Sequence, residues 1–237
     1  MRLHRFFVEE QLRNKKEVTI FDDENIHQWK DVFRLREGNQ VILLDNSGFE
    51  YLCEFTMLSK SKAEFKILEC TAKESSAKKE IWLLAALIKK DNYEWILEKD
   101  TEIGVSHFIP IVSERSEKKN LNMERAQKIV KEASEQSGRS TLPVVDEPVS
   151  LEIAFTNIDP KSLVVFHTEG VVFSSLARES FLDSVHGPIG ILVGPEGGWT
   201  EDEMRFFKDK NIPVYSLGNQ VLRAETAAII IPSLILF

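Results

Sequence analysis

Apolar strands and helical segments alternate along the second half of the chain, and this alternation limits the fold more than any other feature. The clearest apolar runs are IWLLAALI at residues 81–88, LVVFH at 163–167 and IGILVG at 189–194, with further strands expected at 107–112 and 213–217. Segments of helical period lie between them, at residues 92–103, 123–137, 174–184, 200–210 and from 224 onward. Strands that are apolar throughout are typical of a sheet buried on both faces. The sequence therefore predicts an α/β fold with a parallel sheet covered by helices on both sides.

The last helix is apolar on nearly every side, reading AETAAIIIPSLILF at residues 224–237. A helix of this kind has to be buried all round, so the end of the chain is expected inside a core or a dimer interface. Two polar residues near its start, Glu225 and Thr226, allow either helix capping or a role in catalysis.

The first half predicts a small β-barrel or sandwich. Short β-type runs lie between residues 5 and 70, and Asn46, Ser47 and Gly48 mark a turn among them. A helix over residues 24–35 should interrupt the strands and present Ile26, Trp29, Val32 and Phe33 on one face. The polar run TAKESSAKKE at 71–80 has the composition of a linker, and we place the boundary there, with domains at 1–72 and 73–237.

Charge and composition exclude several classes of protein. The 237 residues carry a formal net charge of −8, which argues against a protein that coats nucleic acid, so any contact with RNA must be local. No apolar stretch approaches the roughly 20 residues of a membrane helix, and neither an export signal nor a metal-binding cluster is apparent. A cytoplasmic protein without a metal is expected.

The sharpest local feature is a glycine-rich loop between a strand and a helix, in ILVGPEGGWTEDE. Gly194, Gly197 and Gly198 allow close approach to the backbone, and Thr200 with Glu203 forms a capping box for the following helix. Both a ligand loop and a tight structural turn fit this pattern. The phosphate-loop pattern and the dinucleotide fingerprint are absent, which disfavours a nucleoside triphosphate or a dinucleotide as ligand.

Several motifs, in order, resemble a known family. IGILVGPEGGWTEDE and LGNQVLRAETAA resemble the carboxy-terminal motifs of the 16S ribosomal RNA (uracil-1498-N3) methyltransferases, a SPOUT family. RLHRFFV, HQWKDVFRLREGNQV, TEIGVSHFIPIVSERS and EASEQSGRSTLP match its order and spacing. The resemblance implies a PUA-like β-barrel that helps to grip RNA, followed by a SPOUT methyltransferase domain with a deep trefoil knot. It also implies S-adenosylmethionine as cofactor, a homodimer through the knot region, and 16S ribosomal RNA, in the small ribosomal subunit, as partner.

The same resemblance assigns residues to the site. Those expected around the cofactor are His167, Thr168, Glu169, Gly194, Pro195, Glu196, Gly197, Gly198, Leu217, Gly218, Val221, Leu222, Arg223, Thr226 and Ala227. Those expected to hold RNA are Arg2, Arg5, Arg34, Arg36, Lys118, Lys119 and Arg139.

Methylation of uracil N3 also requires loss of the N3 proton. The candidate donors that stabilise the uracil anion are Arg139, Arg115 and Arg223, and the candidate proton acceptors are Glu225 and Glu196. Non-catalytic roles remain open for three of them. Arg139 could bind a phosphate, Arg115 could form a surface ion pair with Glu102 or Glu114, and Glu196 could accept hydrogen bonds from backbone N–H groups of its own loop.

Two other functions fit the same motifs, and a metabolic α/β enzyme with an appended barrel, which would have no effect on RNA, is a third alternative. One is a SPOUT methyltransferase that modifies another RNA site, such as a ribose 2′-hydroxyl or a transfer RNA base. The other is a non-catalytic module for RNA binding or ribosome assembly, which would not need to bind the methyl donor.

Overall fold

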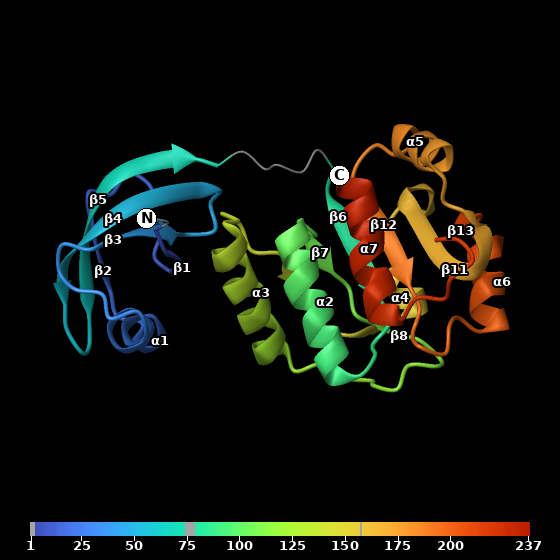
Figure 1. Ribbon diagram of the computed structural model, residues 1–237, viewed down its shortest axis with the longest axis horizontal. Helices are drawn as coiled ribbons and strands as arrows, with labels where there is room; N and C mark the ends of the chain where they lie inside the picture. Colours follow the sequence, from blue (N-terminus) through green and yellow to red (C-terminus); the bar gives the residue numbers. More distant parts are fainter. Residues whose placement is uncertain (1–2, 74–78, 157) are drawn as a thin grey trace. The chain divides into compact units, whose positions relative to one another are not determined.

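A computed structural model describes residues 3–73, 79–156 and 158–237 (Figure 1). The chain forms two compact units. The first contains Met1–Ser76 together with Ser134–Leu142, and the second contains Ala77–Ala133 with Pro143–Phe237. Residues 134–142 therefore group with the amino-terminal unit, which a division at the linker alone does not anticipate. Residues 74–78 of the predicted linker lie outside the described residues.

The first unit is a five-stranded sheet around its own aromatic core. Its strands are β1 (Arg5–Phe7), β2 (Glu17–Ile20), β3 (Gln40–Leu44), β4 (Phe49–Leu58) and β5 (Ala63–Ala72), in the order β1-β3-β4-β5-β2. The β1–β3 pair is parallel and the other pairs are antiparallel. Trp29 is fully buried at the centre and packs edge to face against Phe6, Phe55 and Phe65.

The predicted helix over residues 24–35 differs from the structure in its second half. An α-helix, α1 (Asp23–His27), is followed by a π-helical turn, η1 (Gln28–Val32), and Arg34 ends the segment at a φ of 54°. A π-turn has more residues per turn than an α-helix, so the expected face rotates away from the core. Ile26 and Trp29 are buried, whereas Val32 is 60% exposed and Phe33 is 36% exposed, so the prediction that these four side chains share one face of a single helix is wrong.

The second unit contains a sheet with the strand order β13-β11-β12-β6-β7-β9 in the part of the chain that is described, and all its pairs are parallel, as predicted. Its strands are β6 (Ile81–Ala85), β7 (His107–Phe108), β9 (Val144–Val145), β11 (Leu163–Val172), β12 (Ile189–Val193) and β13 (Val214–Ser216). A short separate pair joins β8 (Ile111–Val112) to β10 (Val149–Ser150).

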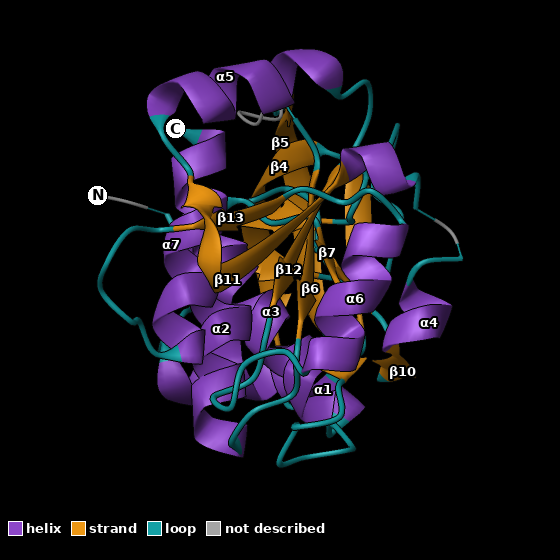
Figure 2. Cartoon of the chain, turned by 90° about the vertical axis from the view of Figure 1, so that its right-hand side faces the viewer, coloured by secondary structure: helices purple, strands orange, loops and turns teal. Residues whose placement is uncertain are grey.

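Helices cover both faces of this sheet (Figure 2). Alternate residues of β6 separate the two cores: Leu83 packs with helices α2 (Lys90–Ile103), α3 (Met123–Ser137) and α7 (Ala224–Leu236), whereas Leu84 packs with α4 (Leu151–Ala154) and α6 (Glu201–Asp209). The remaining helical elements are η2 (Pro160–Ser162) and α5 (Ser175–Ser184). The predicted capping box is confirmed, because α6 has both of its hydrogen bonds, and the helix predicted at residues 92–103 does end at Ile103, followed by Gly104 with a φ of 124°.

The last helix is buried on one side only. It packs against α2, β6 and β12, and Ala228, Ile231 and Ile235 are buried there (Figure 1). Leu234 and Phe237 are exposed, so burial all round is not achieved within the single chain, and burial of this end in a dimer stays a prediction. Within the described residues, no helix combines the length and apolarity that crossing a membrane requires.

Candidate active site

The glycine-rich loop joins β12 to α6 in a turn closed by a 2.8 Å hydrogen bond from the Gly198 N–H to the Pro195 carbonyl oxygen. Gly198 adopts a φ of 68°, which side chains disfavour. A Cβ at Gly194 would lie 3.1 Å from Cε2 of the buried Trp199, so this glycine leaves room for the indole ring. The local structure therefore needs both glycines, whatever the loop binds.

Arg115 holds this loop from outside. Its Nη1 donates to the Gly197 carbonyl oxygen at 2.7 Å and, more weakly, to that of Trp199 at 3.5 Å. The neighbouring Glu114 N–H donates to Glu203 Oε1 at 3.0 Å, which ties the same segment to the start of α6. Arg115 thus braces the glycine-rich loop through its backbone, in place of the surface pair with Glu102 or Glu114 that the sequence left open.

The second part of the site is a bulge in the middle of β11. His167 and Thr168 lie beside a bulge at which β11 changes register against β13. Gly170 makes this possible, because a Cβ there would lie 2.4 Å from the carbonyl carbon of Tyr215. The bulge therefore lies between two stretches of β11 that both pair with β13.

The third part of the site is the loop that connects β13 to α7. Gly218 has a φ of 108° and nothing within 4 Å of the position of a Cβ, so the backbone here borders open space. Arg223 precedes the first residue of α7 and makes no side-chain capping bond, and Glu225 lies buried in the first turn.

The two loops, the bulge in β11 and the start of α2 enclose a cavity of about 590 Å³ beside the carboxyl ends of β6, β12 and β13 and the middle of β11. This size is typical of small-molecule sites, and ligands of α/β proteins bind at this edge of the sheet. The predicted residues that line the cavity are His167, Thr168, Gly194, Pro195, Glu196, Gly198, Leu217, Gly218, Val221, Leu222, Arg223, Glu225 and Ala227. Glu169, Gly197, Thr226 and Arg115 are not among the lining residues.

Sequence reasoning missed part of the wall. The missed lining residues are Lys89, Asn92, Phe166, Val193, Trp199, Ser216, Gln220, Ala224 and Ile231. Lys89 and Asn92 follow the first strand of the parallel sheet, and the rule that ligands bind at the carboxyl ends of such strands was the available signal.

The other predicted residues lie elsewhere. Arg139 belongs to the first compact unit, and burial lowers the pKa of its guanidinium to about 10. Arg5 is largely buried and paired with Glu50 at 3.1 Å. Arg34, Arg36, Lys118 and Lys119 are exposed, while Arg2 lies outside the described residues. No group of three His, Cys, Asp or Glu side chains able to hold a metal gathers within the described ranges.

Comparison with known proteins places the chain in a family. Residues 75–236 match an RNA methyltransferase domain and residues 21–68 match an RNA methyltransferase PUA domain. The chain is similar to ribosomal RNA small subunit methyltransferase E of Rickettsia conorii, at 30% identity over 97% of this chain and 93% of the relative. The Bacillus subtilis protein of the same name is 31% identical over 95% and 93%, respectively.

Solved structures agree. A crystal structure of ribosomal RNA small subunit methyltransferase E from Neisseria gonorrhoeae, bound to S-adenosylmethionine, is 27% identical. It matches with a TM-score of 0.88 over 99% of this chain and 97% of that one. The fold and the cavity therefore define an α/β methyltransferase of the SPOUT class that follows a PUA-like domain. Within this class, the chain belongs to the RNA methyltransferase family of ribosomal RNA small subunit methyltransferase E. The trefoil knot implied by the resemblance stays a prediction.

Proposed function

We propose that this protein uses S-adenosylmethionine to methylate N3 of one uridine in the 16S RNA of the small ribosomal subunit. The observation that carries the proposal is the cavity beside the carboxyl ends of three parallel strands, β6, β12 and β13, in a chain of a ribosomal RNA methyltransferase family. The Neisseria gonorrhoeae relative, bound to S-adenosylmethionine, supports the choice of cofactor. The uridine and its N3 atom come from the motif resemblance.

The lining of the cavity fits this cofactor. Gly218 supplies a stretch of bare backbone that a Cβ would obstruct, while Leu217 and Leu222 offer apolar surface for adenine or the methionyl chain. The sulfonium carries a positive charge, and the carboxylates of Glu196 and Glu225 line the same cavity. The pocket therefore combines backbone access, apolar walls and negative charge.

The chain's own residues would prepare the uracil for attack. When bound, S-adenosylmethionine would supply an electrophilic methyl group, and its methyl–sulfur bond would break so that the sulfur departs as a neutral thioether. The proton on N3 has to leave as N3 forms its bond to carbon, and Glu225 would accept it on a carboxylate oxygen, directly or through water. The negative charge left on O2 and O4 would be stabilised by Arg223 and Lys89, which line the same cavity. Arg115 would act indirectly, by holding the loop that carries Glu196.

The PUA-like domain, placed at residues 1–72, would hold the RNA, with the methyltransferase domain at 73–237. Arg34 and Arg36 are exposed on the barrel and suit phosphate contacts, as do Lys118 and Lys119 in the second unit. A cytoplasmic homodimer would cover the exposed Leu234 and Phe237 at the end of α7.

Mapping of the product tests the proposal. Purified protein and labelled S-adenosylmethionine are incubated with small ribosomal subunits, with free 16S RNA and with transfer RNA, and the modified nucleotide is identified by mass spectrometry. We expect one N3-methyluridine in 16S RNA. The isosteric Glu225→Gln should lose roughly 100-fold or more in turnover, since general base catalysis contributes that much, while the loss of one of the two carboxylates that face the sulfonium should weaken cofactor binding far less.

Other products would redirect the assignment. A 2′-O-methyl group or a methylated transfer RNA would refute the proposed target while leaving the enzyme class intact. Calorimetric titration showing no binding of S-adenosylmethionine would favour a non-catalytic RNA-binding module.

A further inference from the structure

Residues 134–142, the end of α3 and the loop after it, are anchored to the barrel by two side-chain hydrogen bonds. The Phe7 N–H in β1 donates to Glu135 Oε1 at 2.9 Å, and the Leu142 N–H donates to Asn46 Oδ1 at 2.7 Å. The partners are separated by 128 and 96 residues along the chain, so these contacts are tertiary and not local capping. We call this segment the α3 tail.

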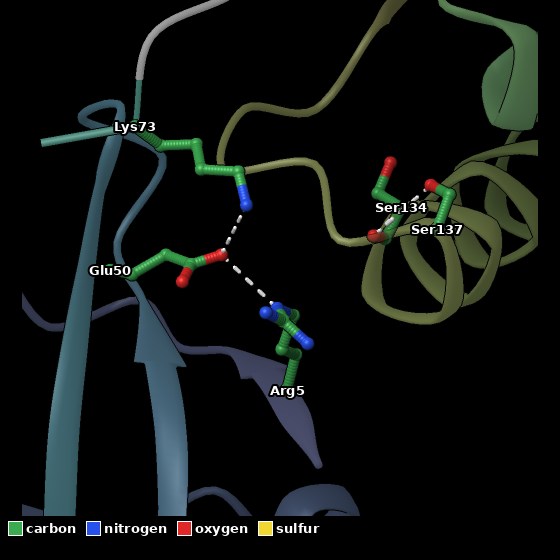
Figure 3. Close-up of polar contacts among 5 residues, drawn as sticks. All are labelled: Arg5, Glu50, Lys73, Ser134 and Ser137. Atoms are coloured by element: carbon green, nitrogen blue, oxygen red, sulfur yellow. Dashed lines mark hydrogen bonds and ion pairs between the residues drawn. The ribbon is translucent and has the colours of Figure 1, made fainter. Parts of the chain in front are cut away.

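A charged cluster supports the α3 tail between the two anchors. Arg5 Nε and Lys73 Nζ donate to the same oxygen of Glu50, at 3.1 and 3.3 Å (Figure 3). Burial raises the pKa of Glu50, but the two cations lower it more, so it stays below its ordinary value and the carboxylate stays charged at neutral pH. Glu50 thereby fixes the Arg5 side chain.

Arg5 in turn lies against the bend of the α3 tail. A Cβ at Gly138 would be 3.5 Å from Arg5 Nε, which is ordinary contact, and Gly138 has a φ of 83° that allows the bend. Figure 3 draws the Arg5 side chain with Ser134 and Ser137 at the end of α3. The chain therefore turns over Arg5 immediately before Arg139.

Arg139 is held by this arrangement at both sides. It lies four residues after Glu135 and three before Leu142, and its side chain is partly buried. At a pKa of about 10 its guanidinium remains charged at neutral pH. A cation restrained at both ends loses little conformational entropy when it binds an anionic group.

We propose that Asn46 and Glu135 are positioning residues for the RNA substrate, which hold the α3 tail on the barrel so that Arg139 and the barrel surface engage one RNA together. The proposal rests on the proposed function, because it deepens how that substrate is recognised. The cofactor cavity lies in the other compact unit, so neither residue is expected to affect cofactor affinity.

The variant Asn46→Gly tests the first anchor. Asn46 has a φ of 61°, which glycine adopts without strain, so the change removes the acceptor and little else. Asn14→Gly is the matched control, since Asn14 has a φ of 64° in an exposed turn of the same barrel. For the second anchor, Glu135→Ala removes the acceptor and Glu135→Gln keeps a carbonyl oxygen for the Phe7 N–H.

Three measurements are compared with wild type: kcat/KM for the RNA, Kd for S-adenosylmethionine, and the rate of trypsin cleavage after Arg139. Asn46→Gly and Glu135→Ala should lower kcat/KM for RNA by roughly fivefold to tenfold, the usual effect of one lost hydrogen bond. Both should speed cleavage at Arg139, with cofactor affinity unchanged. Glu135→Gln should restore most of the loss.

The inference is overturned if Asn46→Gly and Asn14→Gly behave alike in RNA kinetics and cleavage, or if the variants weaken cofactor binding as much as RNA turnover. Failure of the proposed function looks different. Wild-type protein would then leave ribosomal RNA unmethylated, while cleavage at Arg139 would still report whether the anchors restrain the α3 tail.

Discussion

Substitution of Gly170 by alanine should displace a wall of the cofactor cavity, although Gly170 itself does not line the cavity. The new Cβ would lie 2.4 Å from the carbonyl carbon and 2.6 Å from the oxygen of Tyr215, whereas ordinary contacts begin near 3.4 Å. The β13 backbone must therefore retreat by roughly 1 Å, because backbone atoms, unlike a side-chain end, cannot rotate away. Ser216 and Leu217, which follow Tyr215, line the cavity and would move with it.

This displacement of β13 should lower both the stability of the protein and its affinity for the cofactor. Overpacking of this kind costs about 1–3 kcal/mol, so thermal unfolding should shift down by roughly 4–8 °C for a cost near the middle of that range. A shift of about 1 Å in a wall of the site should weaken binding of S-adenosylmethionine by at least roughly tenfold.

Calorimetric titration and thermal unfolding measure both effects. Gly187→Ala is the control, since Gly187 has a φ of 125° and open space around a Cβ, and the change strains the backbone away from β13. We expect Gly187→Ala to lose some stability and to keep wild-type cofactor affinity. Wild-type affinity in Gly170→Ala would refute the argument that β13 sets the position of the cavity wall.

Two further predictions concern residues outside the cavity. Arg115→Ala should weaken cofactor binding by roughly fivefold to tenfold, because the Gly197 carbonyl loses its guanidinium donor; an affinity equal to wild type, measured by titration, would contradict the bracing role. Burial raises the pKa of Asp100 well above 3.8, and neither carboxylate oxygen has a hydrogen-bond partner among the described residues. The folded state therefore holds this proton more tightly than the unfolded state, and stability is lost as pH rises above 3.8, by at most about 1.4 kcal/mol per pH unit. Asp100→Asn removes that loss, so the difference in urea unfolding free energy between variant and wild type should grow with pH; a constant difference would argue against a buried titrating carboxyl.

The parallel sheet and most helices follow from the sequence because their signals are local. Continuous apolar runs predict buried strands, and Gly104 and the Thr200–Glu203 pair mark helix ends by backbone chemistry that depends on few neighbours. The predicted helix at residues 123–137 has the bounds of α3 in the structure.

The predicted and observed elements differ where tertiary packing, and not the local sequence, determines the backbone conformation. The π-turn at Gln28–Val32 places Trp29 in the barrel core, and a helical period of 3.6 does not anticipate its extra residue. The strand predicted at residues 163–167 continues to Val172, because β13 pairs with it on both sides of a bulge.

The candidate site shows the same division. The loops that carry glycines and distinctive motifs were identifiable, and they line the cavity. Lys89 and Asn92 carry no motif, and only the order of strands in space brings them to the same edge. Phe7 lies far from Glu135 in the sequence, and Asn46 lies far from Leu142, so no spacing rule indicates that the barrel holds the α3 tail by these two hydrogen bonds.

The membership of residues 134–142 in the amino-terminal unit has a consequence for how the gene can be divided. A fragment ending at residue 76 lacks the α3 tail, in which Glu135 accepts a hydrogen bond from the Phe7 N–H and the Leu142 N–H donates to Asn46. The complementary fragment contains the α3 tail but lacks the barrel residues that hold it. The barrel therefore cannot be transplanted to another enzyme as one continuous piece. Any recombination that moves it must carry the distant insert as well, which favours inheritance of both halves together.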